Sequence, residues 1–71
     1  MRLSQGSYET LYGIHNDLNL DMMEDIRDFA EDCRMVGAKK TAKYVNRCLR
    51  YESEPDRKII AMYLAEDLAG V

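Results

Sequence analysis

Residues 21–52 decide the fold, and they read DMMEDIRDFAEDCRMVGAKKTAKYVNRCLRYE. On both sides of Gly37, apolar residues recur at spacings of three and four, which is the period of an amphipathic helix. Glycine commonly ends a helix because it adopts the left-handed backbone conformation without strain. We therefore predict two helices, at about 22–36 and 38–52, joined by a short turn at Gly37.

The same spacing predicts which side of each helix faces the core. The inward stripe of 22–36 consists of Met22, Ile26, Phe29, Ala30, Cys33 and Val36, and that of 38–52 of Ala38, Thr41, Ala42, Val45, Cys48 and Leu49. In a hairpin that turns near Gly37, Cys33 and Cys48 are offset by roughly 10 Å along the axis, at about 1.5 Å per residue. This exceeds the roughly 7 Å that a disulfide tolerates between Cα atoms, so we predict two separate, reduced thiols.

Two further helices complete the predicted architecture, at about 8–18 and 55–69. The expected N-caps are Ser7, Asp21 and Ser53, with Pro55 in the first turn of the last helix. Gly13 weakens the first helix, which we expect to be the shortest, and Gly70 ends the last one. The prediction is an all-α fold, a compact bundle of about four short helices in which sequential helices are antiparallel neighbours.

Composition limits the possible classes of protein. The chain has 71 residues, of which 46% are hydrophobic and 32% charged, so residues 1–71 are expected to form a single small helical domain. A net charge of −3 disfavours a protein whose whole surface binds nucleic acid, although a local basic patch remains possible. The N-terminus shows no secretory pattern and the longest apolar run, 59–65, is too short to span a bilayer. We expect a cytoplasmic protein without a membrane partner.

One side of the predicted helix 22–36 is strongly acidic. This acidic face consists of Glu24, Asp25, Asp28, Glu31 and Asp32. Arg27 is the one basic residue between positions 17 and 32, and it is expected to pair with Glu24 and Glu31 across one turn. The remaining like-charge pairs each cost about 0.2–0.5 kcal/mol. The face is either a solvated surface that keeps the chain soluble, or a docking surface for a basic partner or a mimic of nucleic-acid phosphates.

The predicted helix 38–52 carries the opposite charge. Its basic face consists of Lys40, Lys43, Tyr44, Arg47 and Tyr51, with Arg50 on the same side. Tyrosine and arginine are enriched among residues that dominate interface energies, so this face is a secondary candidate for partner binding. The alternative is that both rings cover the rim of the core.

The predicted helix 55–69 is apolar around most of its circumference, with Ile59, Ile60, Ala61, Met62, Tyr63, Leu64, Ala65 and Leu68. A helix of this kind is buried on more than one side. It is therefore expected to be central in the bundle, or to form an interface with a partner or a second copy of the chain.

The residues needed for common catalytic and metal sites are missing. His15 is the single histidine and no two cysteines are closely spaced, which excludes a structural zinc site. Residues 17–21 match the opening of an EF-hand calcium loop, but Met22 replaces the required glycine and Asp28 the bidentate glutamate. No glycine-rich phosphate loop is present. We expect no catalytic, metal-binding or cofactor-binding residues.

The function predicted from these features is that of a non-enzymatic, acidic protein-interaction module. It would act as an inhibitor or adaptor by blocking a surface of a larger protein or nucleoprotein partner. In size, acidity and lack of catalytic groups the chain is similar, in general terms and without a shared motif, to phage-encoded inhibitors of host defence such as anti-CRISPR and anti-restriction proteins. The alternative is a small helix-turn-helix-like DNA-binding regulator that uses the basic helix and dimerises through helix 55–69.

Overall fold

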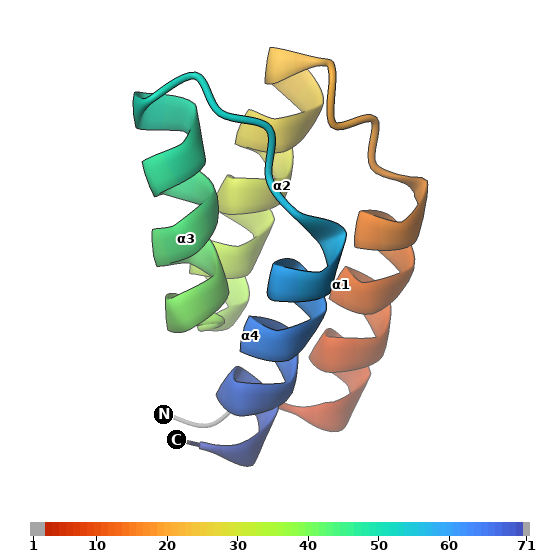
Figure 1. Ribbon diagram of the computed structural model, residues 1–71. Coiled ribbons are helices and arrows are strands. Elements are labelled where there is room, and N and C mark those ends of the chain that lie inside the picture. The colour runs from red at the N-terminus through yellow and green to blue at the C-terminus, as the bar shows by residue number, and fades with distance from the viewer. Residues whose placement is uncertain (1–2, 71) are drawn as a thin grey trace.

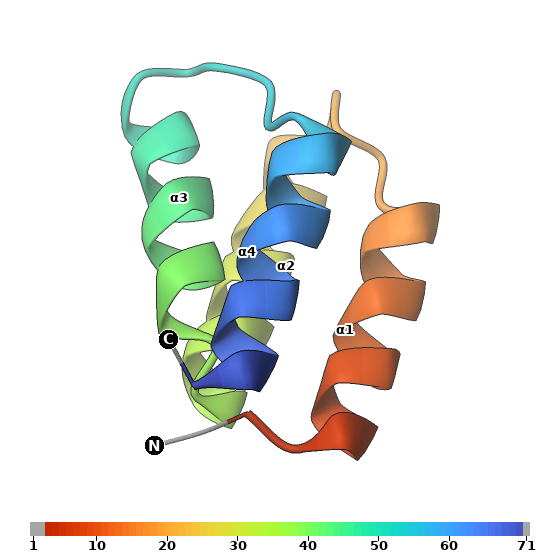
Figure 2. The same cartoon turned by 60° about the horizontal axis from the view of Figure 1, so that its bottom comes forward.

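The computed structural model describes residues 3–70 and consists of four helices connected by short segments (Figure 1). The helices are α1 (Gln5–Asp17), α2 (Met23–Val36), α3 (Lys39–Arg50) and α4 (Arg57–Ala69). Consecutive helices lie side by side and run in opposite directions (Figure 2). No strand occurs in the described part of the chain, and the predicted all-α bundle of four helices is confirmed.

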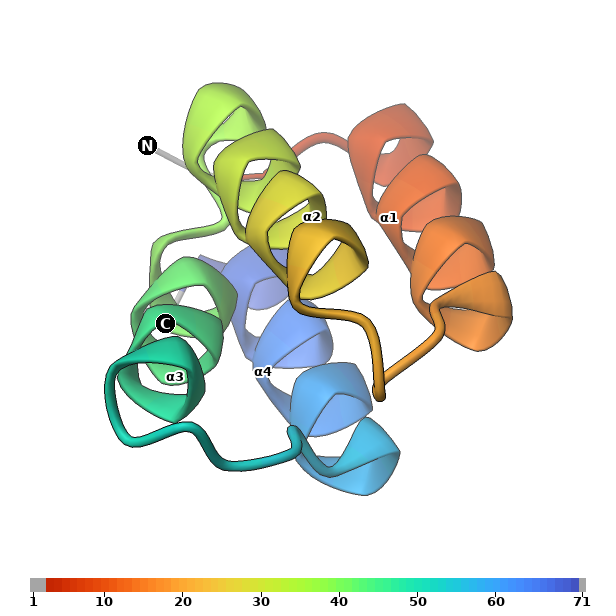
Figure 3. The ribbon, with the colours of Figure 1, turned by 90° about the horizontal axis from the view of Figure 1, so that it is seen from above.

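The four helices form a closed ring when the bundle is seen from above (Figure 3). Each helix packs against its neighbours in sequence, and α4 also packs against α1. The ring therefore has four edges, and the edge between α1 and α2 lies opposite the edge between α3 and α4. These two opposite edges carry the candidate interaction surfaces described below.

The apolar sides of all four helices meet inside this ring. The largest side chains at the centre are nearly inaccessible to solvent: Leu11, Phe29, Val45, Ile60 and Leu64. Cys33 and Cys48 are also buried, and both are free thiols, as predicted. Two predicted core positions are wrong, because Met22 is 48% and Val36 39% exposed. Met22 has extended backbone before α2, so helical spacing does not govern it, and Val36 is the last residue of that helix.

Both predicted glycine stops are confirmed. Gly37 follows α2 with φ of 90° and Gly70 follows α4 with φ of 78°, the left-handed conformation that glycine adopts without strain. At Gly37, the amide of Ala38 donates to the carbonyl of Cys33 at 2.8 Å, which closes the helix end. The end of α3 uses the same pattern of hydrogen bonds with Glu52 at φ of 54° instead of a glycine.

The predicted N-caps are wrong at all three positions. Helix α1 begins earlier than expected because Ser4, not Ser7, accepts the capping hydrogen bond, from the Ser7 amide at 3.1 Å. Helix α4 begins later, because Asp56 rather than Ser53 caps it and accepts from the Lys58 amide at 2.8 Å.

Asp21 does not cap α2. Its amide donates to the Asn19 side chain at 3.1 Å in a turn, and α2 starts at Met23 without a side-chain cap. The earlier start of α1 gives that helix 13 residues, so the shortest helix is α3, with 12, rather than α1 as expected.

Helix α3 receives its N-terminal cap from another helix. Ala38 at the N-cap position has no capping side chain, and Asp67 of α4 takes this role. One carboxylate oxygen of Asp67 accepts from the Lys40 amide at 3.0 Å. The other accepts from the Thr41 amide at 3.0 Å and from the Thr41 hydroxyl at 2.8 Å. A buried carboxylate thus satisfies two free amides at the positive end of α3 and joins it to α4.

Helix α4 packs against α1 and α3, but every helix of the ring has two neighbours, so the expectation that α4 is central in the bundle is wrong. Ile60 and Leu64 are fully buried, whereas Met62 is 48% exposed and Ala65 is also exposed. Dimerisation through this helix stays a prediction. Within residues 3–70, every helix is too short or too polar to traverse a lipid bilayer.

Candidate functional site

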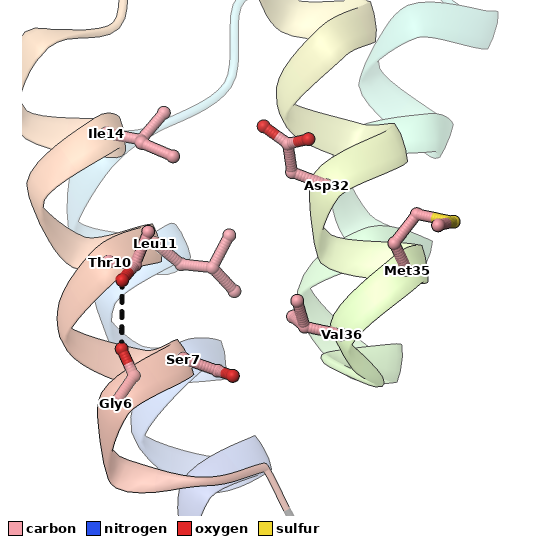
Figure 4. A pocket seen from close by; sticks show the side chains of 8 residues that line it. All are labelled: Gly6, Ser7, Thr10, Leu11, Ile14, Asp32, Met35 and Val36. Carbon is pink, nitrogen blue, oxygen red and sulfur yellow. Dashed lines mark hydrogen bonds between the residues drawn. The ribbon is translucent and has the colours of Figure 1, made fainter.

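A groove runs along the edge of the bundle between α1 and α2. It consists of two adjoining hollows of about 380 and 300 Å³, which share Ile14 and Asp32. The first is lined by Gly6, Ser7, Thr10, Leu11, Ile14, Asp32, Met35 and Val36 (Figure 4), and the second by Ile14, Asp17, Leu18, Asp25, Asp28, Phe29 and Asp32. We call these two hollows together the α1–α2 groove.

Small residues on α1 keep this groove open. Gly6, Ser7 and Thr10 face α2, and a Cβ atom added at Gly6 would meet no other atom within 4 Å. The Thr10 hydroxyl donates back to the Gly6 carbonyl at 3.0 Å, so its polar group is turned along α1 (Figure 4). No hydrogen bond or ion pair between side chains joins α1 to α2 in the described residues.

The groove has an apolar half and an acidic half. Figure 4 shows Leu11 and Ile14 projecting from α1 toward α2, where Val36 and Asp32 lie on the opposite wall. Farther along, the hollow that contains Leu18 and the buried ring of Phe29 is bordered by four aspartates: Asp17, Asp25, Asp28 and Asp32. These four carboxylates form no ion pair with any residue of the described chain. Their charge is therefore available to a ligand in the groove.

The five predicted acidic-face residues separate into two groups. Asp25, Asp28 and Asp32 line the groove, whereas Glu24 and Glu31 are exposed outside it. Asp17 of α1 completes the acidic wall and was missed, because the sequence does not reveal that Asp17 lies on the side of α1 that faces α2. It does belong to the run of acidic residues that begins at that position.

Glu31 has a different partner from the one predicted. It pairs with Arg34, and the hydrogen bond from this guanidinium holds the pKa of the Glu31 carboxyl below its ordinary value. The predicted pairs of Arg27 with Glu24 and Glu31 are absent from residues 3–70, which corrects that expectation. A glutamate placed N-terminal to its basic partner is the favoured orientation on a helix, and Arg34 satisfies it for Glu31 whereas Arg27 does not.

The predicted basic face lies at the opposite edge of the ring, along α3 and toward α4. Two hollows of about 490 and 210 Å³ share Lys43 and Arg47. The larger is lined by Lys43, Asn46, Arg47, Arg50 and Tyr51, and the smaller by Lys40, Lys43, Tyr44, Arg47 and Tyr63. The fold thus brings all five predicted residues together with Arg50, which was expected on the same side, and adds Asn46 and Tyr63.

The two tyrosines of the basic face have different environments. Tyr44 lies against Tyr63 with ring centroids 5.6 Å apart, and its hydroxyl accepts from the Asp56 amide at 2.9 Å. Tyr44 is half-buried and packs against the core, as expected for a ring that covers its rim, and desolvation raises the pKa of its hydroxyl. Tyr51, in contrast, is 69% exposed. Lys40 forms an ion pair with Glu66 at 2.9 Å.

The acidic and basic surfaces are segregated within the fold. No ion pair joins α2 to α3 among residues 3–70, although the two helices are neighbours with opposite charge. Figures 1 and 2 show α2 and α3 running side by side in opposite directions, as a helical hairpin. The alternative of a helix-turn-helix-like regulator that uses α3 is not tested by this arrangement and stays a prediction.

The two cysteines and the single histidine lie inside the fold. Burial, with smaller contributions from the carboxylates of Asp67 and Asp32, raises the pKa of the Cys33 thiol to about 12. Nδ1 of the buried His15 ring lies 2.9 Å from the Tyr12 carbonyl, which it contacts as a hydrogen-bond donor. No group of three or more metal-ligating side chains gathers anywhere in the described range.

Comparison with known proteins gives no relative for this chain: no protein-family model, curated protein or solved structure matches it.

Proposed function

We propose that this protein is a non-enzymatic binding module whose α1–α2 groove holds a basic, amphipathic helical segment of a larger protein. The observation that carries the proposal is the joining of an apolar floor, formed by Leu11, Ile14 and Leu18, to a wall of aspartates without ion-pair partners. Amphipathic helices bind in such grooves through apolar anchors at helical spacing. Lysines and arginines beside those anchors would face the aspartates.

The charge distribution supports a basic occupant over an acidic or neutral one. Asp25, Asp28 and Asp32 recur along α2 at spacings of three and four, so they form one row beside the groove. Maintaining this row costs about 0.2–0.5 kcal/mol for each repelling pair. A bound cationic segment removes this repulsion, so part of the binding energy comes from relief of strain already present in the free protein.

Occupation of the groove gives the protein a way to inhibit its partner. A basic helix held in the groove is sterically and electrostatically prevented from contacting its own acidic or nucleic-acid ligand. This is the manner in which the phage-encoded anti-defence inhibitors noted above are expected to act, and it requires no catalytic group. The two free cysteines support a reducing compartment such as the cytoplasm for this role.

The proposal is tested with a designed amphipathic helical peptide that has leucines on one side and lysines on the other. An equivalent peptide has glutamates in place of the lysines. Calorimetric titration is expected to show binding of the basic peptide alone. The double variant Asp28→Lys, Asp32→Lys is expected to weaken binding at least about tenfold, which corresponds to about 1.4 kcal/mol.

The matched control is the double variant Glu24→Lys, Glu31→Lys. It makes the same change of charge on the same helix, outside the groove, and is expected to weaken binding less than about threefold. Equal losses in the two variants would show that only net charge matters, and binding that survives in both would exclude the groove as the binding site.

A further inference from the structure

The function proposed for the groove does not involve the basic face on α3. Lys43, Arg47 and Arg50 are exposed and have no ion-pair partner in the described chain, and α3 contains no acidic residue. The adjacent ring of Tyr51 is 69% exposed. We propose that this face binds single-stranded nucleic acid, with these cations on the phosphates and Tyr51 stacked against a base.

Residue chemistry favours a nucleic acid over an acidic protein. Guanidinium groups and aromatic rings that lie together on an open surface bind single strands through phosphate contacts and base stacking. The hollow lined by Lys43, Arg47, Arg50 and Tyr51 combines both types of group. Asn46 on the same wall adds an amide that can donate to and accept from a base edge.

The position of the face favours a single strand over a duplex. Lys40 pairs with Glu66 of α4 and Tyr44 contacts Tyr63 of α4, so the aromatic border of the face lies toward α4 and away from α2. If α3 entered a major groove about 12 Å wide, the phosphates on one side would lie over α2, whose axis is about 8–10 Å away. Helix α2, which is itself about 10 Å across, would obstruct that side of the duplex. A single strand along the border between α3 and α4 avoids α2.

The net charge of −3 does not prevent such binding, because the acidic groove occupies the opposite edge of the ring. The bundle measures 28 × 20 × 20 Å, and interactions between exposed charges are largely screened beyond about 8 Å at physiological ionic strength. A strand on the basic face therefore senses mainly the local cations.

The test measures the fluorescence anisotropy of a labelled single-stranded DNA of roughly twelve nucleotides, the same sequence as a duplex, and labelled polyglutamate over a range of salt concentrations. Three phosphate contacts predict that log K for the single strand falls against log salt with a slope of about −2, since each contact contributes about −0.7. The duplex is expected to bind more weakly.

Two variants separate the electrostatic and stacking contributions. Lys43→Gln together with Arg47→Gln should reduce the magnitude of the slope by about 1.4. Tyr51→Ala should weaken binding between about 5-fold and 150-fold and leave the slope unchanged. Lys58→Gln, which removes an exposed cation of α4 outside the two basic hollows, is the matched control and should change neither quantity.

Three results would overturn the inference: no binding of the single strand, a slope that does not respond to loss of Lys43 and Arg47, or polyglutamate binding as tightly as DNA and independently of Tyr51. The last result would assign the face to an acidic protein. The variant Asp28→Asn, Asp32→Asn distinguishes this inference from the proposed function. It should weaken the binding of the basic peptide to the groove and leave the affinity for single-stranded DNA unchanged.

Discussion

The two opposite edges of the bundle are held together by different kinds of interaction. At the α3–α4 edge, Asp67 accepts three hydrogen bonds from Lys40 and Thr41, and the Lys40–Glu66 ion pair lies beside them. At the α1–α2 edge the described residues form no side-chain hydrogen bond between the helices, and a groove remains. One edge is fixed in position by directional contacts, and the other keeps its apolar and acidic groups available.

This difference shows how a chain of 71 residues can combine a stable fold with an open groove. A small bundle has a thin core, so polar groups that satisfy helix ends contribute a large share of its stability. Here they are concentrated at the α3–α4 edge and at the contact of Arg57 with the end of α1. The aspartates of the α1–α2 groove form no ion pair in the described chain, so they can be changed at little cost to the fold.

The largest expected effect comes from removing Asp67. Asp67→Ala leaves two amides and the Thr41 hydroxyl without their acceptor in a buried position, and we expect the free energy of unfolding to fall by about 3 kcal/mol. Asp67→Asn, which keeps the shape, should also destabilise because its amide nitrogen faces donors. Urea denaturation measures both changes.

The neighbouring Glu66→Gln is the control, because its ion pair with Lys40 is partly exposed and should contribute less than about 1 kcal/mol. Similar losses at Asp67 and Glu66 would contradict the view that the α3–α4 edge depends on the buried cap.

The role of Asp67 also shows where prediction from the sequence reaches its limit. Helical spacing and the glycines at 37 and 70 were sufficient for the order of the helices and for most of the core, since both depend on residues close in sequence. The cap of α3 comes from a residue 26 positions away from Thr41, and no local pattern indicates it. The sequence pattern predicted Ser7 as the cap of α1, whereas the fold uses Ser4 and so starts the helix earlier.

For the candidate sites, too, features within one helix could be predicted from the sequence, and features formed by two helices could not. The basic face could be predicted because its five residues lie on one helix, and the structure brings them together. The groove could not, because it depends on the distance between α1 and α2 and on small residues at positions 6, 7 and 10 that do not fill it. Helical spacing placed Asp28 and Asp32 on a polar side, but it did not indicate that the apolar Ile14 and Leu18 lie opposite them.

A second prediction concerns Cys33, whose thiol is influenced by a carboxylate from each edge, Asp67 and Asp32. Its pKa rises from 9.0 to about 12, mainly because of burial. The folded state therefore keeps this proton when the unfolded state loses it, so the stability contribution is present below about pH 9 and lost as the pH rises toward 12. The loss is about 1.4 kcal/mol per pH unit in that range.

Urea denaturation at pH 8, 9 and 10 should show this decline in the wild type and a smaller one in Cys33→Ala. Since burial is the largest cause of the shift, Asp32→Asn should leave most of the decline in place. Identical pH dependence in the wild type and in Cys33→Ala would mean that the thiol is not desolvated in the folded state.

A third prediction concerns Arg57, whose replacement should have an intermediate effect on stability. Its guanidinium donates to the carbonyls of His15 and Leu18 at the end of α1, which otherwise have few partners there. Arg57→Gln should lower the free energy of unfolding by about 1–2 kcal/mol and increase hydrogen exchange near residues 15–20. The neighbouring Lys58→Gln alters an exposed side chain and should have almost no effect. Equal exchange in both variants would show that α1 is positioned by its apolar contacts alone.

The smallest expected change in the free energy of unfolding is that of Asp28→Asn. Unlike the other variants, this one is expected to stabilise the fold. Glu24, Asp25, Glu31 and Asp32 lie three or four positions from Asp28, so four carboxylates repel it across neighbouring turns. It is the sixth residue of α2 and lies beyond the first turn, where the helix dipole would offset this repulsion. Asp28→Asn should therefore raise the free energy of unfolding by about 0.5 kcal/mol in low salt, and by less in high salt because salt screens the repulsion. Glu54→Gln, in the exposed loop before α4, is the control and should change stability very little. A destabilised Asp28→Asn variant would mean that this carboxylate supports the fold, and the groove would then be part of the scaffold instead of a surface kept at a small cost for a basic partner.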